Sequence, residues 1–380
     1  MIMADNNENK VLNVPHLRFP EFTEEWEETT LGKISEITKG SGISKDQLSE
    51  QGSPCILYGE LYTKYKSEII DEVYSRTELD SSSLVKSKAN DVIIPCSGET
   101  AIDISTARCV PFNNILLGGD LNIIRLKHDD GGFFAYQLNG ARKKDIARVA
   151  QGVSVVHLYG ENLKHIRVYH PAIEEQKKIT RLLSLIDERI ATQNKIIEKL
   201  QSLIKGLAVA LTTKEKANIA ISQCLECHSS TLQESEVLSS GLCKVFGANG
   251  LVGYKDVPQM NGDAILVIKD GSGVGTVSYA QGKFSVIGTL NYLTVIGNND
   301  LRYLYFALSV FNFQPYKTGM AIPHIYFKDY GKAKIYCPSL AEQKRVANVL
   351  DKLESKLFVE QELLASFNQQ KLYLLGKMFI

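Results

Sequence analysis

Two stretches of the chain decide its architecture: residues 152–183, GVSVVHLYGENLKHIRVYHPAIEEQKKITRLL, and residues 319–350, GMAIPHIYFKDYGKAKIYCPSLAEQKRVANVL. They align without a gap at an offset of 167 residues. The identical pairs include His157/His324, Tyr159/Tyr326, Tyr169/Tyr336, Pro171/Pro338, Glu175/Glu342, Gln176/Gln343, Lys177/Lys344 and Leu183/Leu350. Self-similarity at a fixed period indicates repeated structural units. The sequence therefore predicts two copies of one unit.

A long helix is expected after each of the aligned prolines, Pro171 and Pro338. Acidic residues soon after each proline favour a helix start there. Apolar residues then recur at alternating steps of three and four, which is the pattern of a coiled-coil seam. The seam residues are Ile179, Leu182, Leu183, Ile186, Ile190, Ile196, Ile197, Leu200, Leu203, Ile204 and Leu207 in the first helix, and Val346, Val349, Leu350, Leu353, Leu357, Leu363, Leu364, Phe367, Leu374 and Leu375 in the second.

Two longer stretches, rich in Gly, Ser, Tyr and β-branched residues, precede these helices. The short apolar runs DVIIP (Asp91–Pro95) and AILVI (Ala264–Ile268) predict buried strands bounded by turns. The polar segment 211–218 is the expected boundary between the two copies. The expected order is a polar tail at residues 1–14, a globular domain at 15–171, a helix at 172–211, a second globular domain at 212–337 and a second helix at 338–380.

Composition excludes some classes of protein. Acidic and basic residues balance at 43 each, so the net charge gives no sign of a nucleic-acid partner. There is no apolar run of about 18 residues, and residues 1–14 lack the apolar core of a signal peptide. The seven cysteines are scattered, which fits a reducing cytoplasm better than a disulfide framework. We therefore expect a cytoplasmic protein without a membrane partner.

The sequence contains no recognised catalytic signature. There is no GxxxxGK[ST] loop for a nucleotide phosphate, and no Pro-Pro of the kind found in amino-methyltransferase motifs. The run GSGVGT at 271–276 precedes a predicted strand rather than a helix, which favours a hairpin turn over a phosphate site. Cys224, Cys227 and His228 give one metal-like pair, whereas structural zinc needs four ligands. The sequence predicts no catalytic residue and no metal site.

The chain resembles the specificity subunits of type I restriction–modification systems. The resemblance begins with PHLRFPEF at residues 15–22, Trp26 and LGKISEI at residues 31–37. It continues in the duplicated order of a glycine-led strand, a Tyr-x-Pro-like turn and Glu-Gln-Lys at the start of a long helix, and it covers essentially the whole chain. The second half departs from the pattern because it lacks the tryptophan-containing first strand. Residues 225–227 (LEC) are expected to take the place of residues 34–37.

The resemblance implies an α+β fold with two α/β target recognition domains, separated by two long antiparallel coiled-coil helices in an internal pseudo-twofold repeat. Each domain would recognise one half of a split site in double-stranded DNA. The helices would dock two methyltransferase subunits, which would carry S-adenosylmethionine and methylate adenine, and motor–nuclease subunits could join them. The chain itself would bind no cofactor and catalyse no reaction.

Candidate DNA-binding residues lie in loops of both halves. Their mixture of Lys, Ser, Thr, Tyr, Asp and Glu side chains supplies the donors and acceptors that groove recognition requires. A neutral protein can bind DNA if its charges are segregated on the surface. In the first half the candidates are Lys39, Ser41, Ser44, Lys45, Tyr62, Lys64, Lys66, Ser97, Glu99 and Thr100; in the second half they are Asn249, Lys255, Lys269, Asp270, Ser272 and His324.

Two other interpretations stay open at this point. The first is a coiled-coil scaffold that bridges protein partners without contacting DNA, which the helical seam and the neutral charge would also suit. Divergent loops on a duplicated framework argue against it, because an adaptor with twofold-related partners would keep both faces alike. The second is an enzyme whose site carries no recognised motif.

Overall fold

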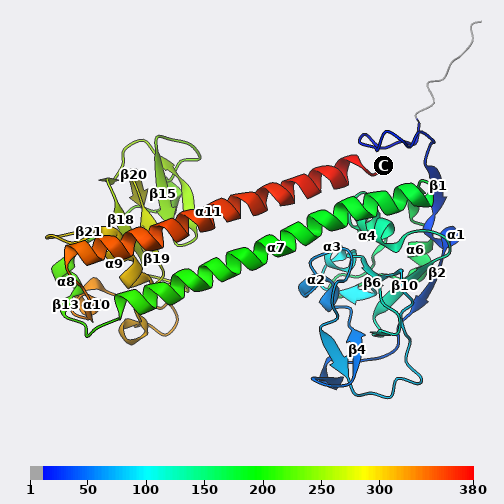
Figure 1. Cartoon of the computed structure of the whole chain (residues 1–380), viewed down its shortest axis with the longest axis horizontal. Helices are drawn as coiled ribbons and strands as arrows, with labels where there is room; N and C mark the ends of the chain where they lie inside the picture. The colour runs from blue at the N-terminus through cyan, green and yellow to red at the C-terminus, as the bar shows by residue number, and fades with distance from the viewer. Residues whose placement is uncertain (1–11) are drawn as a thin grey trace, which may run out of the picture. The chain divides into compact units, whose positions relative to one another are not determined.

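The computed structural model describes residues 12–380 (Figure 1). Most of the predicted polar tail, residues 1–11, lies outside the described residues. The chain forms two compact units, one made of residues up to Gln193 together with Leu363–Ile380, and the other of Asn194–Glu362. Each unit therefore contains one globular domain and a part of each long helix. The linear domain limits given above remain a prediction.

The first globular domain consists of short strands and short helices. They are β1 (Glu27–Thr30), α1 (Leu31–Ile34), β2 (Ser35–Lys39), β3 (Leu48–Ser49), β4 (Ser53–Ile56), α2 (Glu60–Thr63), β5 (Ser75–Thr77), β6 (Asp91–Pro95), β7 (Ser97–Gly98), α3 (Ala101–Ile104), β8 (Arg108–Val110), β9 (Leu116–Leu117), β10 (Leu121–Leu126), α4 (Gly131–Asn139), α5 (Lys143–Val149), β11 (Val156–His157), α6 (Gly160–Lys164) and β12 (Arg167–His170). The first long helix, α7, then runs from Ile173 to Thr212.

The second globular domain repeats this layout with fewer helices. It contains β13 (Ile219–Ala220), α8 (Ile221–Cys224), β14 (Leu225–Ser229), β15 (Cys243–Gly247), β16 (Gly250–Lys255), β17 (Met260–Asn261), β18 (Ala264–Ile268), β19 (Val277–Ala280), β20 (Lys283–Val286), β21 (Leu290–Val295), α9 (Leu301–Ser309), α10 (Phe327–Tyr330) and β22 (Lys334–Ile335). The second long helix, α11, spans Leu340–Lys377. Both long helices begin two residues after the prolines that predicted their starts.

The central sheets of the two units have the same strand order. In the first unit it is β2-β10-β6-β8, and in the second β14-β21-β18-β19, with neighbouring strands antiparallel. The predicted strands DVIIP and AILVI are β6 and β18, and all five residues of each are buried. Strands β18 and β19 form a hairpin around residues 271–276, so the interpretation of GSGVGT as a turn is confirmed. Residues 225–227 lie in β14, the counterpart of β2, as expected.

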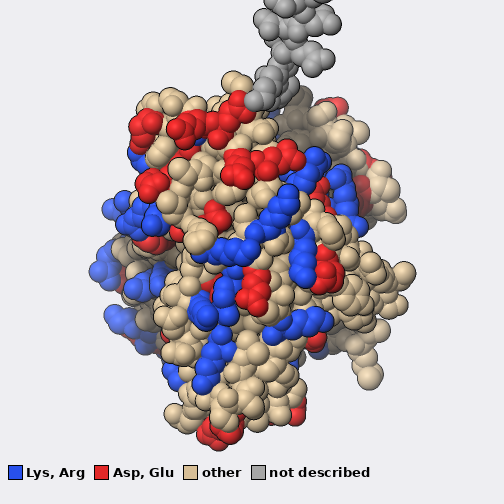
Figure 2. Space-filling view, turned by 90° about the vertical axis from the view of Figure 1, so that its right-hand side faces the viewer, with Lys and Arg blue, Asp and Glu red and all other residues tan. Residues whose placement is uncertain are grey.

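Charged side chains are mixed on the face shown in Figure 2. Acidic residues gather toward its upper edge, and Lys and Arg side chains spread over its middle with several acidic ones among them. This distribution fits the neutral net charge of the whole chain. Any attraction for a polyanion on this face would therefore be local and would depend on individual loops.

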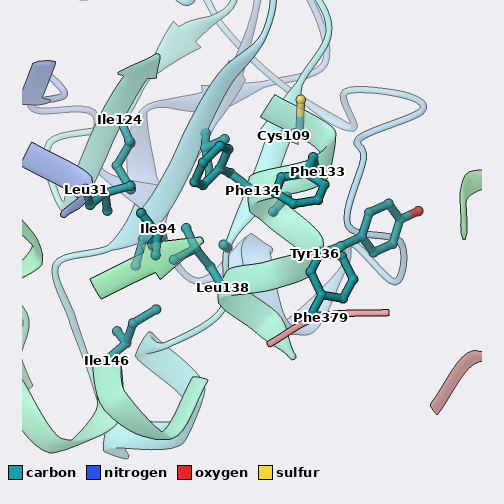
Figure 3. Packing of buried hydrophobic residues seen from close by; sticks show 14 of the residues in the cluster. Leu31, Ile94, Cys109, Ile124, Phe133, Phe134, Tyr136, Leu138, Ile146 and Phe379 are labelled. Carbon is teal, nitrogen blue, oxygen red and sulfur yellow. The ribbon is translucent and has the colours of Figure 1, made fainter. Parts of the chain in front are cut away.

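The main core of the first unit lies around helix α4 (Figure 3). Phe133, Phe134 and Tyr136 on α4 are fully buried; Phe134 lies on the side of the sheet residues Ile94 and Ile124, whereas Tyr136 points away from them, beside Phe379. The second unit has the matching arrangement around α9. Its buried residues there include Tyr303, Leu304 and Phe306, which share a cluster with Ile265, Val267 and Leu293 of its sheet.

The repeated glutamines, Gln176 and Gln343, make the same contacts in both units. The side-chain oxygen of Gln176 accepts a hydrogen bond from the backbone N–H of Asp130 at 2.9 Å, and that of Gln343 accepts one from Asp300 at 2.8 Å. Each aspartate in turn caps the short helix α4 or α9. Each glutamine also donates to the carbonyl of Pro171 or Pro338. The glutamine of the repeated Glu-Gln-Lys motif therefore joins the start of the long helix to the globular core.

The preceding glutamates differ between the units. Glu175 is buried and accepts two hydrogen bonds from Arg18, at 2.8 and 2.7 Å, while the indole N–H of Trp26 lies 3.4 Å away. Its counterpart Glu342 instead pairs with the exposed Arg345 three residues along the same helix. The second half lacks the segment that contains Arg18 and Trp26. The identical glutamates therefore have a tertiary role in one unit and a local role in the other.

The two long helices run antiparallel, as predicted. In the first unit Ile179, near the start of α7, shares a cluster with Leu374, near the end of α11. In the second unit Ala208, near the end of α7, shares a cluster with Val346 and Leu350, near the start of α11. A parallel pair would bring Ile179 to Val346, and these belong to different clusters. The start of each helix also packs on the core of its own unit, because Ile179 and Leu350 belong to those clusters.

The predicted seam is only partly buried. Ile196, Leu203, Val349 and Leu363 belong to the apolar pattern but are exposed. Two helices in contact bury a narrow stripe, and the remaining apolar positions face either a globular domain or solvent. Other apolar side chains of α11, namely Phe358, Val359, Leu372 and Tyr373, are more exposed still. The periodicity therefore predicted the two helices correctly, but it overestimated how many of their apolar side chains are buried.

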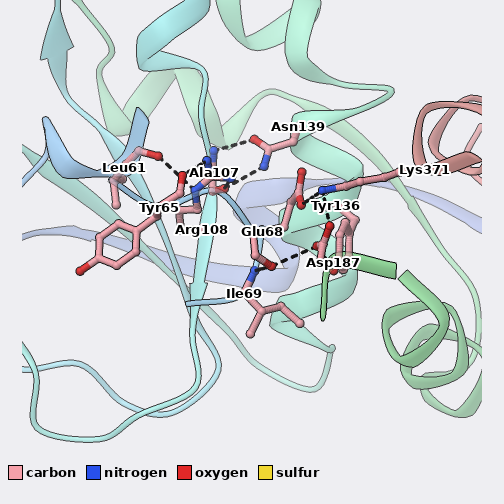
Figure 4. A network of polar contacts seen from close by, with 11 residues as sticks. Leu61, Tyr65, Glu68, Ile69, Ala107, Arg108, Tyr136, Asn139, Asp187 and Lys371 are labelled. Atoms are coloured by element: carbon pink, nitrogen blue, oxygen red, sulfur yellow. Dashed lines mark hydrogen bonds and ion pairs between the residues drawn. The ribbon is translucent and has the colours of Figure 1, made fainter. Parts of the chain in front are cut away.

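A buried network of charges joins both long helices to the first globular domain (Figure 4). The ammonium of Lys371 on α11 lies 2.5 Å from Glu68 and 2.6 Å from Asp187 of α7. Asp187 also accepts hydrogen bonds from the hydroxyls of Tyr136, at 2.7 Å, and Ser67, at 3.0 Å. Burial raises the pKa of Glu68, and the adjacent Lys371 opposes that rise. Lys371 is therefore ion-paired with two buried carboxylates of this unit, and the buried Arg108 also lowers the pKa of Glu68.

Candidate nucleic-acid interface

A cleft of about 1100 Å³ opens in the first unit, beside the loop that follows β2. Gly40 allows the walls of the cleft to approach closely, because a Cβ atom at this position would lie 1.9 Å from the carbonyl oxygen of Gly118. Three candidates, Ser44, Lys45 and Lys64, line the cleft. The structure therefore brings together residues that are up to 20 positions apart in the sequence.

The candidates that line this cleft, and Lys39 and Ser41 next to its lining residue Gly40, differ in how many hydrogen bonds and ion pairs their polar groups already make. Lys64 lies 2.6 Å from Glu60 and donates to the hydroxyl of Ser75 at 3.0 Å. Ser41 accepts a hydrogen bond from the backbone N–H of Val85 at 2.8 Å. Lys39, at the end of β2, and Lys45 are exposed, and neither has an ion-pair partner among the described residues. Lys39 and Lys45 are therefore the better placed of these lysines to bind a phosphate.

Tyr62 and Lys66 lie elsewhere, in a polar pocket of about 490 Å³ that also includes Arg108, Lys143 and Lys371. Burial lowers the pKa of both Arg108 and Lys143. Arg108 donates to the backbone carbonyls of Leu61 and Tyr65 at 3.1 and 2.9 Å. The pocket therefore contains several cations and is separate from the cleft around Lys45.

Three further candidates of the first unit follow strand β6. Ser97 lies in β7, which pairs with β11 so that Ser97 faces His157. Thr100 caps helix α3, because its hydroxyl accepts from the backbone N–H of Asp103 at 3.1 Å and donates to the Asp103 carboxylate at 2.6 Å. Glu99 is exposed. This loop therefore presents Glu99 to solvent and places Ser97 beside the first repeated histidine.

Four candidates of the second unit come together after strand β18. The backbone of Asp270 bridges to His324, and the carbonyl of Lys269 accepts a hydrogen bond from Ile325 N–H at 2.9 Å. Ser272 is exposed in the adjoining turn. This group occupies the place that Ser97 and His157 occupy in the first unit. The sequence alignment already paired His157 with His324, and the matching strand order of the two sheets gives the same equivalence.

Asn249 and Lys255 do not join that group. Asn249 is exposed in the turn between β15 and β16, and Lys255 is the last residue of β16, opposite Cys243. They therefore lie at opposite ends of one strand, in a sheet other than that of β18. The role of every candidate named here in DNA binding remains a prediction.

Two loops border these groups, residues 151–157 and 318–324, and His324 is the one residue of these loops among the candidates predicted from the sequence. Their remaining residues were missed because they are apolar and carry no polar signal for DNA recognition. The aligned glycines Gly152 and Gly319 were the available sign of a shared loop conformation.

Neither a metal site nor a membrane-spanning helix is found in residues 12–380. No three His, Cys, Asp or Glu side chains of this range gather as metal ligands would. No helix of the same range combines the length and the apolar character that crossing a bilayer requires.

Comparison with known proteins places these features in a family. The model of the type I restriction modification DNA specificity domain matches residues 23–202 and again residues 228–369. The chain is similar to the type I restriction enzyme EcoprrI specificity subunit of Escherichia coli, with 24% identity over 110 residues, which are 29% of this chain and 27% of that protein. It is also similar to the MjaVIII specificity subunit of Methanocaldococcus jannaschii, with 25% identity over 218 residues, 56% of this chain and 47% of that one.

These two alignments span less than half the length of either relative. Over nearly the whole chain, the fold is similar to the crystal structure of the type I restriction–modification system S subunit from M. genitalium. The TM-score is 0.71 and the sequence identity 19%, and the match covers 97% of this chain and 99% of that one. The globular domain followed by a long helix, present twice, is therefore a known arrangement.

Proposed function

Because this chain belongs to the family of type I restriction–modification DNA specificity domains, we propose that it recognises the two halves of a bipartite DNA target and docks methyltransferase subunits. The observation that carries this proposal is the duplication of one framework with different loops. The sheets have the same strand order, and the loops after β6 and β18 occupy the same place with different side chains, Ser97 and Glu99 in one and Lys269, Asp270 and Ser272 in the other. A split target with two different halves requires this combination.

The methylation chemistry belongs, in this proposal, to the partner subunits. They would bind S-adenosylmethionine and methylate adenine, and this chain would bind no cofactor. The exposed apolar side chains of α11, among them Phe358 and Tyr373, support the long helices as the docking surface, since such side chains commonly mark protein interfaces. Two methyltransferase subunits, and motor–nuclease subunits beyond them, would complete the assembly.

Attraction to the DNA backbone would come from exposed lysines rather than from net charge. Lys39 and Lys45 lie at or beside the cleft of the first unit and have no ion-pair partner among the described residues. Each phosphate contact of this kind releases counterions, so the binding constant falls with salt. Side chains such as Lys64, already bound to Glu60, would contribute less to this effect.

Gel-shift measurements on the complex with its methyltransferase subunits test the proposal. We expect binding to mixed-sequence DNA that weakens with salt, and we expect Lys45→Ala to reduce the slope of log K against log salt by about one. Lys205→Ala, which removes an exposed lysine from α7, is the matched control and should leave the slope unchanged. A complex that assembles but does not bind DNA would instead support the protein-bridging scaffold.

A further inference from the structure

Two loops close in the same way in the two units. In the first unit the backbone N–H of Gln151 donates to the carbonyl of His157 at 2.9 Å, and the N–H of His157 donates to Gln151 at 2.7 Å. In the second unit Thr318 and His324 exchange the same pair of hydrogen bonds, at 2.9 and 2.8 Å. Each loop therefore has its two ends fixed, and its middle residues project from a closed base.

A glycine in the left-handed region gives both loops their shape. Gly152 has φ of 120° and Gly319 has φ of 87°. A Cβ atom would lie 2.1 Å from the carbonyl oxygen of Val155 at the first position and 2.3 Å from that of Ile322 at the second. No other residue fits there without a shift of the backbone. The loops are thus two copies of one conformation.

The middle of each loop exposes apolar side chains. Val153 is 96% exposed and Val155 54%, while Met320 is 105% exposed and Ile322 66%. Apolar side chains gathered at an exposed tip cost free energy in water and commonly mark a binding surface. Each loop also borders a candidate DNA-binding segment, since β11 pairs with Ser97 and His324 bridges to Asp270. The tips therefore project beside the loops that differ between the two units.

The pattern of identity between the loops favours DNA over a protein partner. The base keeps its glycine and its histidine in both copies, Gly152/Gly319 and His157/His324, and Tyr159/Tyr326 follow it, while the other closing residue is Gln151 in one copy and Thr318 in the other. The tip differs at every position, VSVV at residues 153–156 and MAIP at residues 320–323. A surface that bound the same methyltransferase twice would retain its contact residues. A surface that recognised two different half-sites would have different contact residues in the two copies but the same supporting loop conformation.

We propose that residues 153–155 and 320–322 are base-contacting tips, each making apolar contacts to base edges of its own half-site in the major groove. The C5-methyl group of thymine is the apolar feature that such side chains would recognise there. This inference rests on the proposed DNA-recognition function and adds to it the residues and the chemical class of the contact. The polar candidates beside each tip would supply the hydrogen bonds that apolar side chains cannot.

The test uses the complex with methyltransferase subunits and a DNA library, with methylated sites mapped by sequencing. In the double variant Met320→Ala with Ile322→Ala, preference should weaken roughly five- to a hundred-fold at one or two base positions of one half-site. The other half-site should stay unchanged, and Val153→Ala with Val155→Ala should give the mirror result. Val295→Ala is the matched control, because it shortens an exposed apolar side chain at the end of β21 that lies away from the loop after β18 and away from the long helices.

Replacement of thymine by deoxyuridine at the affected positions removes the methyl group and should weaken the wild-type complex far more than the variant. Unaltered preferences in both double variants would overturn the inference. So would loss of the methyltransferase subunits from the purified variant complex, because that would make the tips a protein-docking surface. If the proposed function itself were wrong, the wild-type complex would show no bipartite preference in the same library.

Discussion

Replacement of residues 15–170 by the first recognition domain of another specificity subunit is expected to change one half of the methylated target and leave the other half intact. The loops of the first unit are supported by clusters within that unit, and those of the second unit by separate clusters. Several base pairs would change at once, and each mismatched pair costs about 1–3 kcal/mol. The original target should therefore lose on the order of a thousand-fold or more in methylation.

The exchange must preserve the contacts that cross its boundary. Arg18 and Trp26 bind Glu175 at the start of α7, and Glu68 binds Lys371 at the end of α11. The incoming domain should therefore carry an arginine, a tryptophan and an acidic residue at these three places. A wild-type domain grafted back into the same junctions is the control. Alteration of both target halves by one exchange would contradict the modular account.

Lys371→Met is expected to destabilise the first unit by about 3–5 kcal/mol, because it removes the cation that is directly ion-paired with two buried carboxylates and leaves only the more distant Arg108 to balance them. Glu68 and Asp187 are almost fully buried and both lie within 2.6 Å of the lysine. Methionine keeps most of the length of the side chain, so the change removes charge with little change in packing. Denaturant unfolding of the purified chain measures the loss.

Lys356→Met is the matched control on the same helix. Lys356 is exposed and pairs with Glu360 one turn away at 3.0 Å, so its replacement should cost no more than about 0.5 kcal/mol. Equal losses in the two variants would show that the buried network around Lys371 does not stabilise the unit.

The defect of Lys371→Met should depend on pH in a defined direction. Burial already raises the pKa of Glu68 in the folded chain, and removal of Lys371 removes the largest of the interactions that oppose this rise. A carboxyl group whose folded pKa lies above its unfolded pKa takes up a proton on folding, so lower pH favours the folded state. The difference between wild type and variant should narrow as the pH falls from neutral toward about 5. If the stability difference between wild type and variant widened at lower pH, Glu68 would be excluded as the source of the pH dependence.

The sequence was most informative where a local pattern determined the structure. The apolar runs at β6 and β18, the prolines before α7 and α11, and the alignment at an offset of 167 residues predicted the fold and its duplication. Each of these features is a short-range pattern of apolar residues or turn formers. Even there the identical glutamates Glu175 and Glu342 proved to have different partners, because the arginine and tryptophan of one unit have no counterpart in the other.

The candidate interface was less accessible to sequence reasoning. The sequence did not show that the ammonium of Lys64 is bound by Glu60 and Ser75, since only the fold brings Ser75 close to it. The contact between Glu68 and Lys371 joins residues more than 300 positions apart. The exposed tips at Val153 and Met320 consist of apolar residues, which a search for polar DNA-binding side chains passes over. Such features depend on tertiary proximity and exposure, which residue spacing does not contain.

The central claim, that this chain selects the DNA to be methylated and catalyses nothing itself, is tested most directly by mapping methylation with and without it. Three reactions would each contain S-adenosylmethionine and a random-sequence library. The first would add the methyltransferase subunits alone, the second the methyltransferase subunits together with this chain, and the third this chain alone. The account predicts methylation at one bipartite motif only when the chain and the methyltransferase subunits are present together. Methylation by this chain alone, or the same motif methylated by the methyltransferase subunits without it, would contradict the account.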